Sequence, residues 1–150
     1  MNPRDVKTAQ DALALIDARG LSHVKVGVID MDGILRGKYM SRDKFASSLE
    51  GGFGFCDVVL GWDSNDQLYD NTRFTGWHTA YPDAPVRILP ETCRELPMEK
   101  NMLFFLGEFA DRAETVGPRA VLRRAIQRCN DLGFTPFGAM EFEFFVFEET

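Results

Sequence analysis

The run from Gly138 to Phe147 places two carboxylates inside a stretch of aromatic and β-branched residues. Such residues favour a β-strand, and alternate residues of a strand point to opposite faces, so Glu141 and Glu143 are expected on one face. Phenylalanines occupy both faces of this predicted strand, which indicates that the strand is covered on both sides. Two buried like charges are costly unless a positive group neutralises them. The run therefore predicts a covered strand whose carboxylates need a cation.

Two interpretations of this carboxylate pair remain open. In the first, Glu141 and Glu143 bind Mg²⁺ or Mn²⁺, the divalent cations that carboxylate oxygens usually hold. In the second, they are ordinary solvated charges on the wet face of an edge strand. Only residues 144–150 follow the pair, so we expect any further ligands, and hence a complete active site, to lie outside these 150 residues.

Composition and charge indicate a soluble globular protein. The chain is 45% hydrophobic, has no stretch as long as a membrane span, and does not begin like a signal peptide. The net charge is −6, and the one basic cluster suits the exposed face of a helix, so a nucleic acid is not expected as a partner. That cluster is Arg119, Arg123, Arg124 and Arg128.

Cysteine and histidine give no sign of a metal site or a disulfide framework. Cys56, Cys93 and Cys129 are odd in number and widely spaced, which indicates a reducing cytoplasm. His23 and His78 are single residues without ligand spacing, so we interpret both as structural or surface residues.

Periodicity and turn residues predict a mixed sequence of helices and strands. A helix should end at Gly20, a hairpin should turn at Asp32-Gly33, and a short helix should begin at Ser41 and end at Gly51-Gly52. Strands are predicted over 24–28, 34–40, 55–60, 86–89 and 102–109, and a further helix follows Gly117-Pro118 and carries an apolar face formed by Val121, Leu122, Ala125, Ile126, Cys129 and Leu132.

The long polar stretch from Gly61 to Pro85 separates two of these predicted strands. A loop of this length is usually functional or disordered, and its aromatic residues argue against disorder because they need burial or a partner. The element order predicts an α+β protein with a compact unit over residues 1–112 and the start of a second unit over 113–150.

Most of residues 20–150 resemble the N-terminal part of the glutamine synthetase family. Gly138 to Phe147 is similar to the Gly-x-Glu-x-Glu-Phe-Phe-x-Phe strand that opens the catalytic domain of that family. The resemblance implies a β-grasp N-terminal domain followed by the first helix and strand of a catalytic domain. It also implies that Glu141 binds the metal contacting the ATP phosphates and that Glu143 binds the metal beside the glutamate substrate.

The same resemblance extends to the long loop. In the family, an Asp at the spacing that Asp63 keeps from Pro82-Asp83 reaches a neighbouring subunit's active site, where it binds and deprotonates ammonium. A carboxylate suits both tasks. Asp66 stands where the glutamine-forming enzymes carry Ser, which keeps a larger amine or a polyamine open as the substrate. The alternative interpretation of Asp63 is a turn-forming residue in a solvated loop.

The resemblance implies an ATP-dependent ligase that joins an amine or ammonia to the γ-carboxylate of glutamate. It implies Mg²⁺ or Mn²⁺, a ring-forming homo-oligomer and a cytoplasmic location. The family's later Asn-Gly-Ala-Gly-x-His and Lys-Pro segments do not occur here, so we expect these 150 residues to be an N-terminal fragment that is inactive alone. Two alternatives stay open: a family member that has lost catalysis, and a non-catalytic β-grasp binding or oligomerisation module that uses the aromatic loop residues Trp62, Trp77 and Tyr81.

Overall fold

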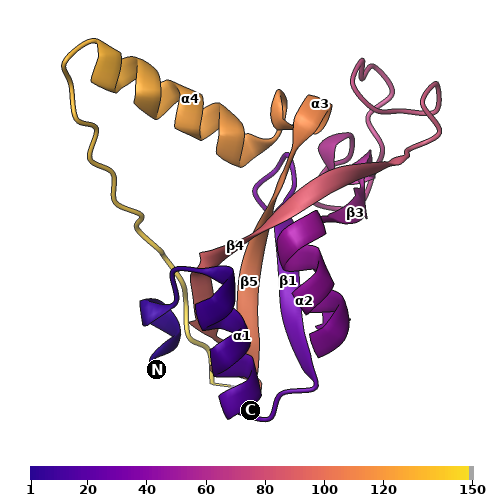
Figure 1. Ribbon diagram of the computed structural model, residues 1–150. Helices are drawn as coiled ribbons and strands as arrows, with labels where there is room; N and C mark the ends of the chain where they lie inside the picture. Colours follow the sequence, from indigo (N-terminus) through magenta and orange to yellow (C-terminus); the bar gives the residue numbers. More distant parts are fainter. Residues whose placement is uncertain (149–150) are drawn as a thin grey trace.

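The computed structural model describes residues 1–148 as a mixed α+β fold with one five-stranded sheet (Figure 1). Among these residues, no helix is long and apolar enough to cross a membrane. The helices are α1 (Ala9–Ala18), α2 (Arg42–Gly51), α3 (Asp111–Glu114) and α4 (Pro118–Asp131), with the 3₁₀ turns η1 (Pro3–Asp5) and η2 (Asp57–Leu60). The strands are β1 (His23–Ile29), β2 (Leu35–Ser41), β3 (Phe53–Cys56), β4 (Asp83–Glu95) and β5 (Leu103–Phe109).

The sheet combines parallel and antiparallel pairing in the order β2-β1-β5-β4-β3. The central strands β1 and β5 run parallel, whereas the β1–β2, β3–β4 and β4–β5 pairs are antiparallel. The predicted α+β class is confirmed, and the mixed, twisted sheet is consistent with the predicted β-grasp domain.

The core lies between the sheet and the helices α1 and α2, which pack on the same face (Figure 1). Val24, Val26 and Val28 are fully buried on β1, as their alternation predicts. Phe45 of α2 and Phe105 of β5 are also fully buried, with ring centroids 4.6 Å apart. The aromatic pair therefore joins α2 to the middle of the sheet.

The predicted turns and helix ends are confirmed where the residue type has a specific backbone role. Gly20, Gly33 and Gly52 have φ values of +63°, +84° and +69°, in the left-handed region that side chains disfavour. The Ser41 hydroxyl accepts a hydrogen bond from the Lys44 amide and begins α2. These residues place the β1–β2 hairpin and α2 as the sequence predicts.

The predicted strand over residues 55–60 is wrong beyond Cys56. Cys56 pairs with Asp83, the first residue of β4, so the ladder ends where its partner strand begins. The next residues form η2, and the buried Asp57 carboxylate accepts a hydrogen bond from the buried Thr75 hydroxyl. This contact ties the far part of the long loop back to the sheet.

The predicted strand over Gly138–Phe147 is also absent from the described residues. This segment has no regular secondary structure, and its side chains are exposed. A strand needs the hydrogen bonds of a neighbouring strand, and none of the five strands pairs with this segment. The expected covered face with Glu141 and Glu143 is therefore not formed.

Helix α4 contacts the sheet through arginines of its first two turns rather than through the predicted apolar face, and most of the helix is exposed. Arg119 and Arg123, expected in solvent, lie against the buried Glu108 of β5, whereas Val121, Leu122 and Ile126 are exposed. The physical reason is that Glu108 requires cationic partners at this end of the sheet. The division into a unit over 1–112 and the start of a second unit over 113–150 stays a prediction. Residues 149–150 lie outside the described residues.

Candidate functional site

A small loop, residues 61–69 and hereafter the Asp63 loop, begins the long connection between η2 and β4. It lies beside the tip of the β1–β2 hairpin, at one end of the sheet (Figure 1). Trp62 and Leu68 form a β-bridge, and the Tyr69 amide donates to the Gly61 carbonyl at 2.9 Å. These contacts close the base of the loop and leave Asp63 near its start.

The Asp63 carboxylate shapes the loop with one of its two oxygens. Oδ1 accepts hydrogen bonds from the amides of Asn65 at 2.8 Å and Gln67 at 2.9 Å, an arrangement typical of Asx turns. Within residues 1–148, no hydrogen bond reaches Oδ2. The turn-forming interpretation is therefore supported for Oδ1, while Oδ2 of this half-buried side chain takes no part in shaping the loop.

Arg36 joins the hairpin to the Asp63 loop. From β2 its Nε contacts the Asp30 carboxylate at 2.7 Å, and its Nη1 contacts the Asp66 carboxylate at 2.6 Å. Its guanidinium lies 4.9 Å from the Trp62 ring centroid, within range of a cation–π interaction. The hydrogen bond with Asp30 raises the pKa of Arg36 above its ordinary value. The loop is thus ionically linked to the sheet.

The hairpin carboxylates complete this link. Asp30 is fully buried, and its Oδ1 accepts from the amides of Asp32 at 3.0 Å and Ile34 at 2.8 Å. Asp32 accepts from the Ser64 amide at 2.8 Å and from the Tyr69 hydroxyl at 3.3 Å. Burial, followed by the Asp32 charge, raises the pKa of the Tyr69 phenol. The sequence pattern at Asp32-Gly33 indicated only a turn, and no sequence signal identified Arg36.

Glu141 and Glu143 are not brought together with Asp63. In Figure 1 the segment that carries them descends at the left, whereas the connection that contains the Asp63 loop lies at the upper right. Within residues 1–148, no group of three or more His, Cys, Asp or Glu side chains could hold a metal ion. Both carboxylates are exposed on a segment without regular secondary structure, so no element of the fold holds them in a common geometry around an ion.

We therefore expect the 150-residue chain to bind divalent cations only weakly. Titration of Mn²⁺ into this chain should give a Kd weaker than about 10⁻⁴ M, because two carboxylates that are not held in place add little binding free energy. The double variant Glu141→Gln, Glu143→Gln should change this Kd less than about twofold. Calorimetric binding at micromolar Mn²⁺ that disappears in the double variant would contradict the expectation.

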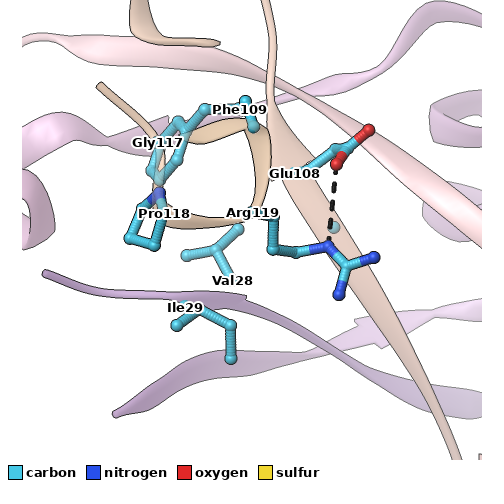
Figure 2. Close-up of a pocket in the computed structure, with 9 residues that line it drawn as sticks. Val28, Ile29, Glu108, Phe109, Gly117, Pro118 and Arg119 are labelled. Carbon is cyan, nitrogen blue, oxygen red and sulfur yellow. Dashed lines mark ion pairs between the residues drawn. The ribbon is translucent and has the colours of Figure 1, made fainter. Parts of the chain in front are cut away.

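A second charged cluster lies where α4 meets β5 (Figure 2). Glu108 is 5% exposed and contacts Arg87 at 2.6 Å, Arg123 at 3.0 Å and Arg119 at 3.6 Å; Figure 2 shows the Arg119 contact. Burial raises the pKa of Glu108, but the hydrogen bonds from Arg87 and Arg123 outweigh it and lower the pKa below the ordinary value. The adjoining cavity of about 10 Å³ has room for no more than a water molecule, and the ion pairs of Glu108 join α4 to β5.

The sequence comparisons give a consistent set of relatives, although no protein-family model matches the chain. Type-1 glutamine synthetase 2 of Dictyostelium discoideum is 43% identical over 129 residues, which cover 84% of this chain and 25% of that protein. Glutamate–isopropylamine ligase of a Pseudomonas species is 28% identical over 141 residues, covering 90% of this chain and 30% of that protein. Gamma-glutamylethanolamide synthetase of Streptomyces coelicolor is 30% identical over 141 residues, covering 91% and 30% respectively.

Solved structures confirm the fold assignment. The glutamine synthetase of Plasmodium falciparum superposes with a TM-score of 0.61 at 13% identity, covering 89% of this chain and 24% of that one. GmaS in complex with ADP superposes with a TM-score of 0.59 at 15% identity, covering 81% and 26% respectively. This chain spans only 25% to 30% of the length of the sequence relatives it matches. The chain is therefore similar in sequence to part of a glutamine synthetase and of two glutamate–amine ligases, and it shares a fold with solved glutamine synthetase structures.

Proposed function

We propose that this chain forms the N-terminal part of an ATP-dependent ligase that joins an amine or ammonia to the γ-carboxylate of glutamate. The observation that carries the proposal is the 43% identity to a glutamine synthetase over 84% of the chain. Two further relatives are named as a glutamate–isopropylamine ligase and a γ-glutamylethanolamide synthetase, which is why the proposal includes amines larger than ammonia.

Asp63 is the residue we propose to act on the amine. Its Oδ1 is engaged by the loop amides, and its Oδ2 accepts no hydrogen bond within the described residues. A carboxylate oxygen of this kind attracts an ammonium group and can take the proton whose removal frees the nucleophilic nitrogen. Asp63 thus shapes the loop with one carboxylate oxygen and acts on the amine with the other.

We further propose that the site is completed by other parts of a longer, oligomeric protein. The segment that carries Glu141 and Glu143 lies apart from the Asp63 loop (Figure 1), which supports a site shared between subunits. In this proposal Glu141 and Glu143 contribute two carboxylates to the binding of Mg²⁺ or Mn²⁺, the ions that accompany ATP, and other ligands come from elsewhere. The free cysteines Cys56, Cys93 and Cys129 support a cytoplasmic location.

Exposed apolar surface favours one alternative, a non-catalytic β-grasp module that binds partners or mediates oligomerisation. Trp77 is 81% exposed, and α4 presents the apolar side chains Leu122 and Ile126 to solvent. Surface of this kind marks interaction sites. The ligase proposal also requires subunit contacts, so exposure alone does not favour the module over the enzyme.

Measurement of ADP release by the full-length protein separates the two functions. With ATP, Mg²⁺ and glutamate, we expect ADP release that requires an added amine from a panel of ammonium, isopropylamine and ethanolamine. Identification of the amide product by mass spectrometry assigns the substrate. A folded, nucleotide-binding protein that releases no ADP with any of these amines would contradict the ligase and favour the module.

A further inference from the structure

The unusual feature of the Asp63 loop is a side chain that enters it from another element. Arg36 is only 19% exposed, and its guanidinium contacts Asp30 on one side and Asp66 on the other, at 2.7 and 2.6 Å. Its Nη2 also donates to the Asp63 backbone carbonyl at 3.4 Å. One arginine therefore joins the residue proposed to act on the amine to a buried carboxylate of the β1–β2 hairpin turn.

We propose that Arg36 is a positioning residue that holds Asp63 in place, and that Asp66 serves as its loop partner rather than as a contact for the amine. The inference rests on the proposed function only for the identity of the reaction. The positioning itself follows from the contacts of Arg36 with the hairpin and the loop.

The chemistry of the arginine explains how one side chain performs this task. Its planar guanidinium directs donors along several fixed directions and can lie on an aromatic ring at the same time, which a lysine ammonium cannot do. The buried Asp30 fixes one edge of the guanidinium, because a fully buried carboxylate requires a cationic or hydrogen-bonding partner. The other edge then faces the loop, where the Asp66 carboxylate contacts Nη1 and the Asp63 carbonyl accepts a hydrogen bond from Nη2.

The backbone of Asp66 supports the same assignment. Its φ of 62° lies in the left-handed region, which Asp and Asn adopt more readily than most residues. Its amide donates to the Asp63 carbonyl at 3.1 Å, so the turn that presents the Asp66 carboxylate to Arg36 also includes Asp63. A residue whose charge is already paired within its own subunit is poorly suited to select an external amine.

Asp66→Asn is the first test, because asparagine keeps the left-handed backbone and the shape while it removes the charge. In hydrogen–deuterium exchange on the full-length protein, we expect the amides of Ser64, Asn65 and Gln67 to exchange about fivefold faster, as loss of a partly exposed ion pair predicts. Arg36→Lys should have the same effect, since the lysine ammonium can neutralise Asp30 but cannot also reach Asp66. Asp43→Asn is the matched control, since Asp43 pairs with Arg42 and is 94% exposed, and it should leave the loop amides unchanged.

Steady-state kinetics with several amines then distinguish positioning from amine selection. If Asp66 acts through Arg36, Asp66→Asn should raise the KM of every amine by a common factor of about five, with the KM of ATP unchanged. If Asp66 contacts the amine, the ratio of kcat/KM between ammonium and isopropylamine should change instead, which would overturn the proposal. Loop amides that exchange at the wild-type rate in both Asp66→Asn and Arg36→Lys would also overturn it.

The exchange measurement needs no catalytic activity, so the two proposals fail separately. Faster loop exchange in a protein without amide-forming activity would support the role of Arg36 and contradict the ligase. Amide formation that proceeds normally in Asp66→Asn, with unchanged loop exchange, would support the ligase and contradict the role of Arg36.

Discussion

Replacing Asp63 with asparagine in the full-length protein is expected to lower kcat/KM for the amine by about 100-fold, the lower range for removal of a general base. Asparagine keeps an oxygen that can accept from the amides of Asn65 and Gln67, so the turn should persist. It lacks the negative charge and the proton acceptor that we assign to Oδ2. Steady-state kinetics with varied amine concentration measure the fall in kcat/KM. Equilibrium binding of ATP, which should be unchanged, shows that the nucleotide site is intact.

The structure makes Asp63→Ala a less specific test than Asp63→Asn. Alanine removes both oxygens and leaves the amides of Asn65 and Gln67 without their acceptor, so lost activity in this variant would combine a chemical with a conformational effect. Asp70→Asn, an exposed charge in the same connection, is the control and should retain full activity. Wild-type amine kinetics in Asp63→Asn would exclude Asp63 as the base and leave it a turn residue.

Local rules predicted the parts of this fold in which sequence neighbours determine the structure. The β1–β2 hairpin depends on Gly33, and α2 depends on the Ser41 cap and on Gly52, all of which act within a few residues. The alternation of Val24, Val26 and Val28 identified the buried face of β1 because one strand face always meets the core. Such signals are present in any short window of the sequence.

Long-range pairing could not be predicted in the same way. Whether Gly138–Phe147 becomes a strand depends on a neighbouring strand, and the described residues provide none. Periodicity identified both faces of α4 but could not say which face meets the domain, because the answer depends on Glu108 of β5, a buried acid in a hydrophobic run. The arginines of α4 were expected in solvent because they are charged. Arg119 and Arg123 instead contact the buried carboxylate of Glu108.

The candidate site shows the same division. The resemblance selected Asp63, and the Asx-turn chemistry of that residue was one of the two interpretations open from the sequence. Arg36 was not selected, since an arginine on a hairpin strand usually points into solvent. Its role becomes visible only when Asp30 and Asp66, far apart in sequence, are both found beside it.

The Glu108 cluster gives the prediction with the largest effect on stability. Glu108→Gln keeps the size of the side chain and removes the charge that pairs with Arg87 and Arg123. Hydrogen bonds to charged groups contribute about 1.5–3 kcal/mol, and the half-exposed arginines favour the lower end, so we expect unfolding to cost about 2 kcal/mol less. Urea denaturation of the 150-residue chain at pH 7 measures this difference. Glu91→Gln, an exposed acid on β4, is the matched control and should change stability by less than about 0.5 kcal/mol.

The pH dependence of the Glu108→Gln effect identifies its cause. The pKa of Glu108 is lowered in the folded protein from an ordinary value of 4.5, so its contribution is complete above that value and is lost as the pH falls through the folded pKa. The difference in unfolding free energy between the wild-type chain and Glu108→Gln should therefore be constant from neutral pH to above 4.5 and decrease at lower pH. A difference that persists undiminished in acid would mean that shape rather than charge holds α4 against β5, and the arginine face of α4 would then owe its position to packing alone.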